Sequence, residues 1–428
     1  MAEDDIYGNK KRYETFKINL EQFAIEPKKR KTKNRRGNQN AKYYCKNRKN
    51  LEYFKRLFVH FEAKDLSFIR RMRMLHSMQL TSHICEKDMQ QCDRNDINGI
   101  MAIMHNTYTS PKTKETFIKD LKHIWKMLFP EIDEKERPDE TIVPYPVRHL
   151  SARIDKSRQK LRGDKITWEE FEQLVNFFNG DARMQLYLNL ALECLARPQE
   201  LLYLKIRDVE LHDNYAKIWI SEHGKEGTGL LQCIDSYPYL LKWLKLHPMR
   251  NNQESYLFIN TGNTNTLKQL RPENVNKMIR LACNRLKINK PITCYSLKRN
   301  GVTIRRLRGE TDMEIQHAAR WASTQQLKTY DMSNQEDALK RELQKRGLLT
   351  GENIKPIENK RCTFCNTIAG FNEKTCPNCY HLLDRTAIVK EATKKDEEIE
   401  QLQKKMDELR KFVMSNLTEK ILQTMESS

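Results

Sequence analysis

Apolar residues recur at helical intervals along residues 50–130, and this spacing predicts a helical unit. The clearest helix is expected to begin near Ser110, which can cap the first turn, and Pro111, which suits the first helical position. It should extend to about Phe129. The apolar stripe of this helix is expected to comprise Phe117, Leu121, Ile124 and Leu128.

A second pattern of apolar residues follows a proline-containing stretch, 131–150, which is typical of an interdomain linker. Thr167 and Glu170 have the spacing of a capping box and predict the start of a helix. Further helices are expected over residues 181–195, 236–248 and 271–288.

Residues 215–222 alternate between apolar and polar side chains, which is the period of a β-strand. Gly224, Gly227 and Gly229 favour a turn, and residues 230–234 return as a second strand. The resulting hairpin would present Lys225 at its tip. The expected fold class is therefore mainly α with a small β-sheet (α+β).

Charge adds a class of partner to this picture. The chain has 428 residues, enough for two or three domains, and a net charge of +20. Residues 28–49 contain eleven Lys or Arg and no acidic residue, so we expect residues 1–49 to form a basic, disordered arm. Such an arm suits phosphate binding, although a solubilising tail is the alternative. A stripe on the helix from Ser110 suits a solvated face or a DNA-facing surface equally well: Lys119, Lys122 and Lys126.

Two classes of location are disfavoured by the sequence. No run of 18 apolar residues is present, so no membrane span is expected, and the first residues lack the apolar core of a secretory signal. We therefore expect a cytoplasmic protein with a polyanionic partner, for which nucleic acid is the first candidate and an anionic membrane surface the second.

Four short motifs occur in order along residues 190–332. They are an Arg-Pro-Gln-Glu-Leu segment, a Gly-Lys pair in the hairpin, a Tyr-Ser-Leu-Lys-Arg segment, and a Trp followed nine residues later by a Tyr. Each motif alone is weak, because a single Arg, Lys, Trp or Tyr is more often structural. The residues that carry these motifs are Arg197, Lys225, Tyr295, Lys298, Arg299, Trp321 and Tyr330.

In this order and spacing the motifs resemble the catalytic domain of tyrosine recombinases, the phage and Xer-like integrase family. The resemblance implies a catalytic domain over residues 146–350, preceded by a helical core-binding domain over residues 50–145 that holds double-stranded DNA. It also implies site-specific cutting and rejoining of DNA through a 3′-phosphotyrosyl intermediate at Tyr330, with Lys225 as general acid. Neither ATP nor a catalytic metal is expected.

The third motif departs from the family pattern of His-x-x-Arg. Tyr295 stands at the histidine position and can still donate a hydrogen bond. Lys298 stands at the arginine position and keeps the charge without the bidentate fork, whereas Arg299 is next in the chain. The residues leave open which of the two fills the role. They also leave open an alternative, a catalytically impaired DNA-binding protein on the same fold.

Four cysteines near the C-terminus form two Cys-x-x-Cys pairs ten residues apart. Two such pairs can supply four thiolates to one tetrahedral zinc ion, with no position left for catalysis. We expect a zinc ribbon over residues 351–383, and the appended ribbon is similar to that of archaeal members of the family and their mobile elements. The ligands would be Cys362, Cys365, Cys376 and Cys379.

Residues 384–428 are expected to form a charged C-terminal helix. Apolar residues spaced three and four apart favour a short coiled coil, although a single amphipathic helix packed on the body is the alternative. They are Ile399, Leu402, Met406, Leu409 and Val413. Self-association on DNA, as a tetrameric synapse, would match the resemblance. A zinc-ribbon regulatory or scaffolding protein assembled through this tail is a further alternative.

Overall fold

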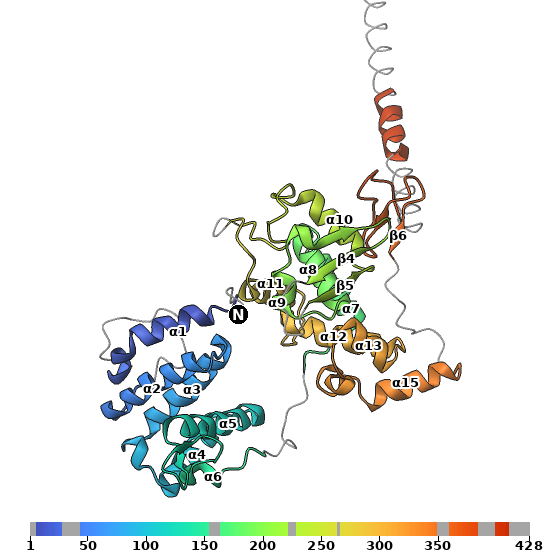
Figure 1. Cartoon of the computed structure of the whole chain (residues 1–428). Coiled ribbons are helices and arrows are strands. Elements are labelled where there is room, and N and C mark those ends of the chain that lie inside the picture. Colours follow the sequence, from blue (N-terminus) through green and yellow to red (C-terminus); the bar gives the residue numbers. More distant parts are fainter. Residues whose placement is uncertain are drawn as a thin grey trace, which may run out of the picture. The chain divides into compact units, whose positions relative to one another are not determined.

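The computed structural model describes residues 6–27, 43–153, 163–220, 228–262, 266–348, 359–383 and 399–410. The chain divides into two compact units, Met1–Leu161 and Arg162–Ser428. Helices dominate the described parts of both units, and three small antiparallel sheets accompany them (Figure 1). This confirms the prediction of a mainly α protein with a small β-sheet.

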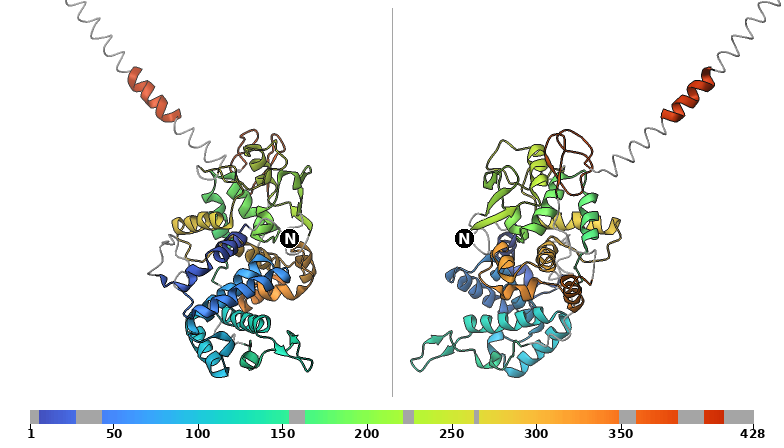
Figure 2. Two further views of the ribbon diagram at one scale, coloured as in Figure 1. Left: turned by 60° about the vertical axis from the view of Figure 1, so that its left-hand side comes forward. Right: turned by 90° about the vertical axis from the view of Figure 1, so that its right-hand side faces the viewer.

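The first unit is a helical bundle around one apolar core. Helix α3 packs against α1 and α5, and α2 also packs against α5; these helices are among the blue and teal ribbons of Figure 2. Its elements are α1 (Asn9–Ile18), α2 (Leu51–Ala63), α3 (Phe68–Ile84), α4 (Arg94–Thr107), α5 (Pro111–Leu128), α6 (Tyr145–Arg148), β1 (Glu131–Ile132) and β2 (Pro138–Asp139), with short 3-10 turns at Leu20–Ala24, Arg48–Asn50 and Met89–Gln91.

Helix α5 matches its prediction closely. Ser110 occupies the N-cap position and Pro111 the first helical position. All four residues of the predicted stripe are buried. The three lysines on its other face are engaged within the protein: Lys119 pairs with Glu115 at 2.6 Å, and the ammonium groups of Lys122 and Lys126 donate to backbone carbonyls at 3.2 and 2.7 Å. These contacts do not distinguish a solvated face from a DNA-facing surface, and both stay predictions.

The prediction of a disordered arm over residues 1–49 is wrong for residues 6–27 and 43–49. Helix α1 packs against α3, and Tyr13 is fully buried with its ring edge-on to Phe58 at 5.6 Å. Leu20 and Phe23 add to the same core. The apolar residues between the charges were sufficient to anchor this segment. The most basic part of the predicted arm, residues 28–42, lies outside the described residues.

The stretch 131–150 is part of the first unit and not a linker. Strands β1 and β2 form a small hairpin, and Val147 of α6 is fully buried in the core of the bundle. The boundary between the units therefore lies after Leu161, later than the predicted boundary at residues 145–146.

The second unit is built around α8. Every residue of α8 is buried, and the helix packs against α7, α10, α12 and β5. The elements are α7 (Trp168–Phe177), α8 (Ala182–Glu193), α9 (Pro198–Leu202), β3 (Val209–Leu211), β4 (Ala216–Ile220), β5 (Gly229–Cys233), α10 (Tyr237–Leu246), α11 (Pro272–Arg285), α12 (Cys294–Leu307), α13 (Asp312–Ala318), α14 (Leu327–Tyr330), α15 (Gln335–Lys345), β6 (Lys360–Arg361) and β7 (Ile368–Ala369), with 3-10 turns at Ile206–Asp208 and Thr324–Gln326.

The predicted helices and hairpin of this unit are confirmed. The capping box of Thr167 and Glu170 begins α7, with hydrogen bonds of 2.8 and 3.2 Å. Strands β4 and β5 pair in antiparallel register, with Ala216 opposite Cys233. Strand β3, which is too short to show a period in sequence, adds to the other side of β4.

Ser333 and Glu336 have the spacing of a capping box, which predicts a helix from residue 334, but α15 begins one residue later at Gln335. The reciprocal capping bonds join Asn334 and Asp337, both at 2.8 Å. The hydroxyl group of Ser333 donates instead to Asp331 at 2.8 Å. The helix stops before Gly347, whose φ of 67° is the left-handed conformation that terminates helices.

Residues 399–410 form a helix whose apolar stripe is exposed. Ile399, Leu402, Met406 and Leu409 are 53 to 65% exposed, and Val413 lies outside the described residues. None of the helices that the structure describes is long and apolar enough to cross a membrane.

Candidate active site

Arg197 lies at a sharp turn between α8 and α9. Leu195 precedes it with a φ of 52°, and Arg197 itself is the N-cap residue of α9. Its backbone N–H donates to Glu200 Oε2 at 2.7 Å, and its Nη1 donates to Glu200 Oε1 at 3.2 Å. These bonds fix the backbone and the guanidinium group together.

Helix α12 brings the third motif against this turn. Gly301 permits the approach, because a Cβ there would lie 2.1 Å from the carbonyl oxygen of Leu192 and 2.6 Å from a methyl group of Leu195. A side chain at position 301 would therefore push α12 away from the end of α8. This close contact sets the distance between the first and third motifs.

The adjacent residues Lys298 and Arg299 point to different surroundings. Lys298 is fully buried, and its Nζ lies 5.2 Å from the ring centroid of Tyr330 and 5.6 Å from that of Trp321. The guanidinium group of Arg299 forms an ion pair with Asp164 and donates to Ser296 at 3.2 Å. Consecutive residues on a helix project about 100° apart, so only Lys298 faces the two rings.

Three aromatic side chains complete the cluster. The rings of Trp321 and Tyr330 stack with centroids 5.2 Å apart, and the hydroxyl groups of Tyr295 and Tyr330 share a hydrogen bond of 3.0 Å. The indole N–H of Trp321 is buried and has no hydrogen-bond partner among the described residues. This N–H is a donor left for a ligand oxygen.

The electrostatic surroundings keep Tyr295 neutral. Burial raises the pKa of Tyr295 to about 12, and the hydrogen bond with Tyr330 acts in the same direction, whereas the charge of Arg197 opposes it. Tyr295 therefore retains its proton at neutral pH and can donate a hydrogen bond, as the sequence predicts for this position.

The structure thus brings together Arg197, Tyr295, Lys298, Trp321 and Tyr330 from separate elements. The guanidinium group of Arg299 lies at the edge of the cluster, 5.6 Å from the ring centroid of Tyr295. Lys225 lies outside the described residues, in the connection between β4 and β5.

Sequence reasoning did not assign a role to Arg320. Its Nη2 donates to Glu200 Oε2 at 2.9 Å, on the carboxylate that also holds Arg197. A carboxylate three residues after the first arginine was visible in the sequence, but its second partner lies 120 residues away. Only the folded chain brings the two arginines together.

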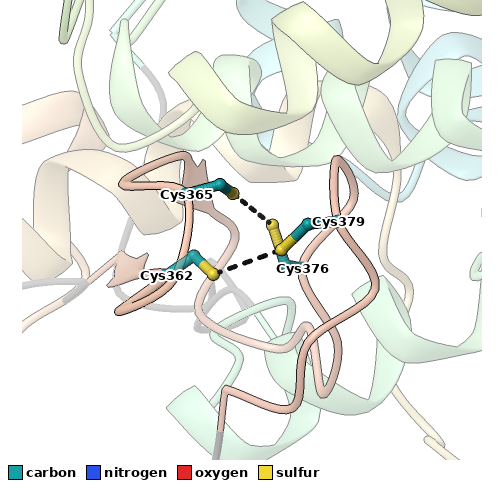
Figure 3. A group of neighbouring side chains, drawn as sticks. All are labelled: Cys362, Cys365, Cys376 and Cys379. Carbon is teal, nitrogen blue, oxygen red and sulfur yellow. Dashed lines mark hydrogen bonds between the residues drawn. The ribbon is translucent and has the colours of Figure 1, made fainter.

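The four cysteines of the predicted ribbon converge. Their Sγ atoms all lie within 4.8 Å of one another, with Cys362 and Cys379 at 3.5 Å and Cys365 and Cys376 at 3.4 Å (Figure 3). A tetrahedral zinc site with Zn–S distances of about 2.3 Å requires S–S separations of roughly 3.8 Å, so the arrangement fits zinc.

The two Cys-x-x-Cys turns have the same local geometry. In each, the residue after the second cysteine donates its backbone N–H to the first cysteine's carbonyl at 2.9 Å and has a φ near 60°. These residues are Asn366 (59°) and Tyr380 (61°). Hydrogen bonding with Thr367 lowers the pKa of Cys365 to about 5, whereas a backbone hydrogen bond with His381 lowers the pKa of Cys379 but the other thiols of the cluster raise it to about 12. Two equivalent turns that direct four thiols toward one point suit a closed structural metal site.

This cysteine module, residues 359–383, packs on the helices α7 and α10 of the second unit. Glu373 pairs with Lys242 of α10 at 2.6 Å, and the Phe371 ring lies 5.3 Å from Trp168 of α7. A Cβ at Gly370 would lie 2.5 Å from the Tyr239 ring, so the backbone of the module lies directly on α10. The module is part of the second unit.

The comparisons with known proteins agree with this geometry. Residues 164–337 match the model of the phage integrase family. No curated protein matches the chain in sequence.

Three solved structures share the fold. The XerH site-specific recombinase, in a post-cleavage complex with palindromic difH substrate, is 16% identical, with 69% of this chain and 86% of that chain covered and a TM-score of 0.53. A lambda integrase dimer bound to a COC′ core site is 13% identical, with 66% and 96% covered and a TM-score of 0.52. A lambda integrase tetramer bound to a Holliday junction is 12% identical, with 65% and 76% covered and a TM-score of 0.51. Residues 164–337 are therefore a phage integrase (tyrosine recombinase) family domain, in a chain that has the fold of these recombinases.

Proposed function

We propose that this protein is a site-specific DNA recombinase that cuts and rejoins duplex DNA through a covalent Tyr330 intermediate. The observation that carries the proposal is the cluster itself. A buried lysine and an indole whose N–H has no partner among the described residues lie against the Tyr330 ring, and the Tyr330 hydroxyl bonds to that of Tyr295, which interacts with Arg197. The cluster lies in a phage integrase family domain.

The cations suit the charge that develops during phosphoryl transfer. A phosphodiester is anionic and repels nucleophiles, and negative charge builds on its nonbridging oxygens in the transition state. Arg197 would bind these oxygens through its planar guanidinium group. Lys298 would supply the second charge, because its ammonium group lies on the faces of Trp321 and Tyr330, whereas Arg299 is committed to Asp164.

Tyr330 would be the nucleophile. Its Oη gives up its proton, attacks the phosphorus and forms a 3′-phosphotyrosyl bond, while the bond to the 5′ oxygen breaks and the leaving oxygen takes up a proton, so that no net proton is consumed. Lys225 is proposed as the donor of that proton on the basis of the family resemblance. The hydroxyl groups of Tyr295 and Tyr330 share a hydrogen bond of 3.0 Å. When DNA enters, the Tyr295 hydroxyl would donate its hydrogen bond to a nonbridging oxygen of the phosphate instead.

The remaining parts of the chain are proposed to support DNA binding and assembly. The first helical unit would hold duplex DNA, and the exposed stripe of residues 399–410 would associate with a second copy in a tetrameric synapse. The cysteine module would hold structural zinc, as in archaeal members of the family. The enzyme would act in the cytoplasm, without ATP or a catalytic metal.

Covalent capture on randomised DNA tests the proposal and identifies the target site in one experiment. The full-length protein is incubated with a pool of nicked duplexes of randomised sequence, and DNA that remains attached in denaturant is recovered and sequenced. We expect enrichment of one site and an adduct at Tyr330 by peptide mass spectrometry. Tyr330→Phe should form no adduct and should still bind the enriched duplex.

The same experiment distinguishes the catalytically impaired alternative. Specific binding without any adduct, over the whole pool, would contradict the proposed activity and favour a DNA-binding protein on this fold. Association through residues 399–410 without specific DNA binding would favour the scaffolding alternative.

A further inference from the structure

Arg320 has a backbone conformation that favours glycine. It follows α13 with a φ of 55°, and the backbone N–H groups of Arg320 and Trp321 donate to the carbonyls of His317 and Gln316, both at 3.0 Å. This is the helix-ending turn in which the left-handed residue is usually glycine. A side chain retained at such a position needs a compensating interaction.

The side chain of Arg320 makes that interaction within the second unit. It is 11% exposed and donates from Nη2 to Glu200 Oε2 at 2.9 Å. It also lies against the first residue of β5, because a Cβ at Gly229 would be 2.8 Å from Arg320 Cδ. Arg320 therefore joins the turn before Trp321 to α9 and to the strand that leaves the hairpin.

Glu200 is a fully buried side chain shared by two guanidinium groups. It accepts from Nη1 of Arg197 at 3.2 Å and from Arg320 at 2.9 Å. With Arg197 alone, the carboxylate would cancel the arginine's charge and leave a neutral pair. With Arg320, the three side chains carry one net positive charge, since both arginines remain protonated.

We propose that Arg320 is a positioning residue for strand cleavage, which acts by neutralising Glu200 so that the charge of Arg197 is available to the scissile phosphate. The inference rests on the proposed function. It assigns Arg320 no contact with DNA. In a site of low dielectric, the uncompensated carboxylate would oppose the charge that builds on the phosphate oxygens.

The test compares Arg320→Gly with the wild type on the duplex recovered by covalent capture. Glycine relieves the left-handed backbone, so the variant should stay folded by circular dichroism. Cleavage at saturating DNA should fall about 10- to 100-fold, with DNA affinity unchanged. Lys287→Gly is the matched control, because Lys287 is also basic and left-handed, with a φ of 57°, but is exposed; it should cleave like the wild type.

A second substrate separates an electrostatic role from a structural one. A methylphosphonate at the scissile position replaces a nonbridging oxygen with a methyl group and removes the phosphate's charge. The ratio of wild-type to Arg320→Gly cleavage should then fall to about 3-fold or less. An unchanged ratio on both substrates would overturn the proposal.

Two further variants test the route through Glu200. Adding Glu200→Gln to Arg320→Gly should recover part of the lost cleavage, because the carboxylate charge is gone. Arg320→Lys keeps a positive charge at this position and should therefore retain most of the wild-type cleavage. Full activity of Arg320→Gly, or no recovery in the double variant, would refute the role. Failure of the wild type to form any adduct would instead refute the proposed function.

Discussion

The cluster around Tyr330 and the cysteine module are both built from polar side chains, but one is open to a ligand and the other is closed. The four thiols face one another within 4.8 Å, so all four sulfur atoms can bind a single metal ion inside the module. In the Tyr330 cluster, by contrast, the indole N–H of Trp321 has no hydrogen-bond partner among the described residues.

This difference separates stability from catalysis. A closed set of metal ligands stabilises the segments that it joins. Unsatisfied hydrogen-bond donors near buried cations can bind an anion, but leaving them unsatisfied in the free protein lowers its stability. Removing a member of a closed set should therefore lower stability, and removing a member of the open cluster should lower cleavage. Arg299, which pairs with Asp164, belongs to the closed kind although it is next to Lys298.

The largest expected effect is the loss of stability in Arg299→Met. Breaking a largely buried ion pair leaves the Asp164 carboxylate uncompensated, so the free energy of unfolding should fall by about 3–5 kcal/mol. Denaturant unfolding measures this change. Adding Asp164→Asn should restore part of the stability, and an unchanged midpoint in the single variant would show that the pair contributes nothing.

Lys298→Met should have the opposite outcome. Methionine has a similar length and keeps the packing of the buried aliphatic stem, so the free energy of unfolding should fall by less than in Arg299→Met. Cleavage should fall about 10²–10³-fold, which is roughly 3–4 kcal/mol of transition-state stabilisation. Adduct formation on the captured duplex measures it, with Lys277→Met on the exposed face of α11 as the control. Cleavage close to that of the wild type would show that a residue other than Lys298 supplies the second positive charge to the phosphate.

The smallest effect is expected from loss of metal. Cys376→Ser, or a chelator, should release one zinc ion per chain by native mass spectrometry and lower the Tm, by about 2–4 °C for each kcal/mol lost from a unit of this size. Cleavage below the new Tm should stay within about 3-fold of wild type, because the module contacts α7 and α10 rather than the Tyr330 cluster. A loss of cleavage in parallel with the loss of metal would show that the cysteine module contributes to catalysis as well as to stability.

Local signals predicted much of the fold. The capping box at Thr167, the stripe of α5 and the alternation of β4 depend on neighbours within a few residues, and all three are confirmed. The cysteine module also depends on local spacing, because each Cys-x-x-Cys turn is closed by a hydrogen bond within the turn. The errors arose where a local signal competed with packing. Charge density hid the buried Tyr13, and Ser333 lost its capping role to Asn334.

The sequence by itself determined most of the longer elements, the thiol pairs and the residue types of the candidate site, because helical period, capping and short spacings are properties of adjacent residues. Tertiary structure alone decided which of Lys298 and Arg299 faces Tyr330, because the direction of a side chain depends on how α12 packs against α8 at Gly301. It alone also placed Arg320 on Glu200, since residues 120 positions apart meet only when the chain folds.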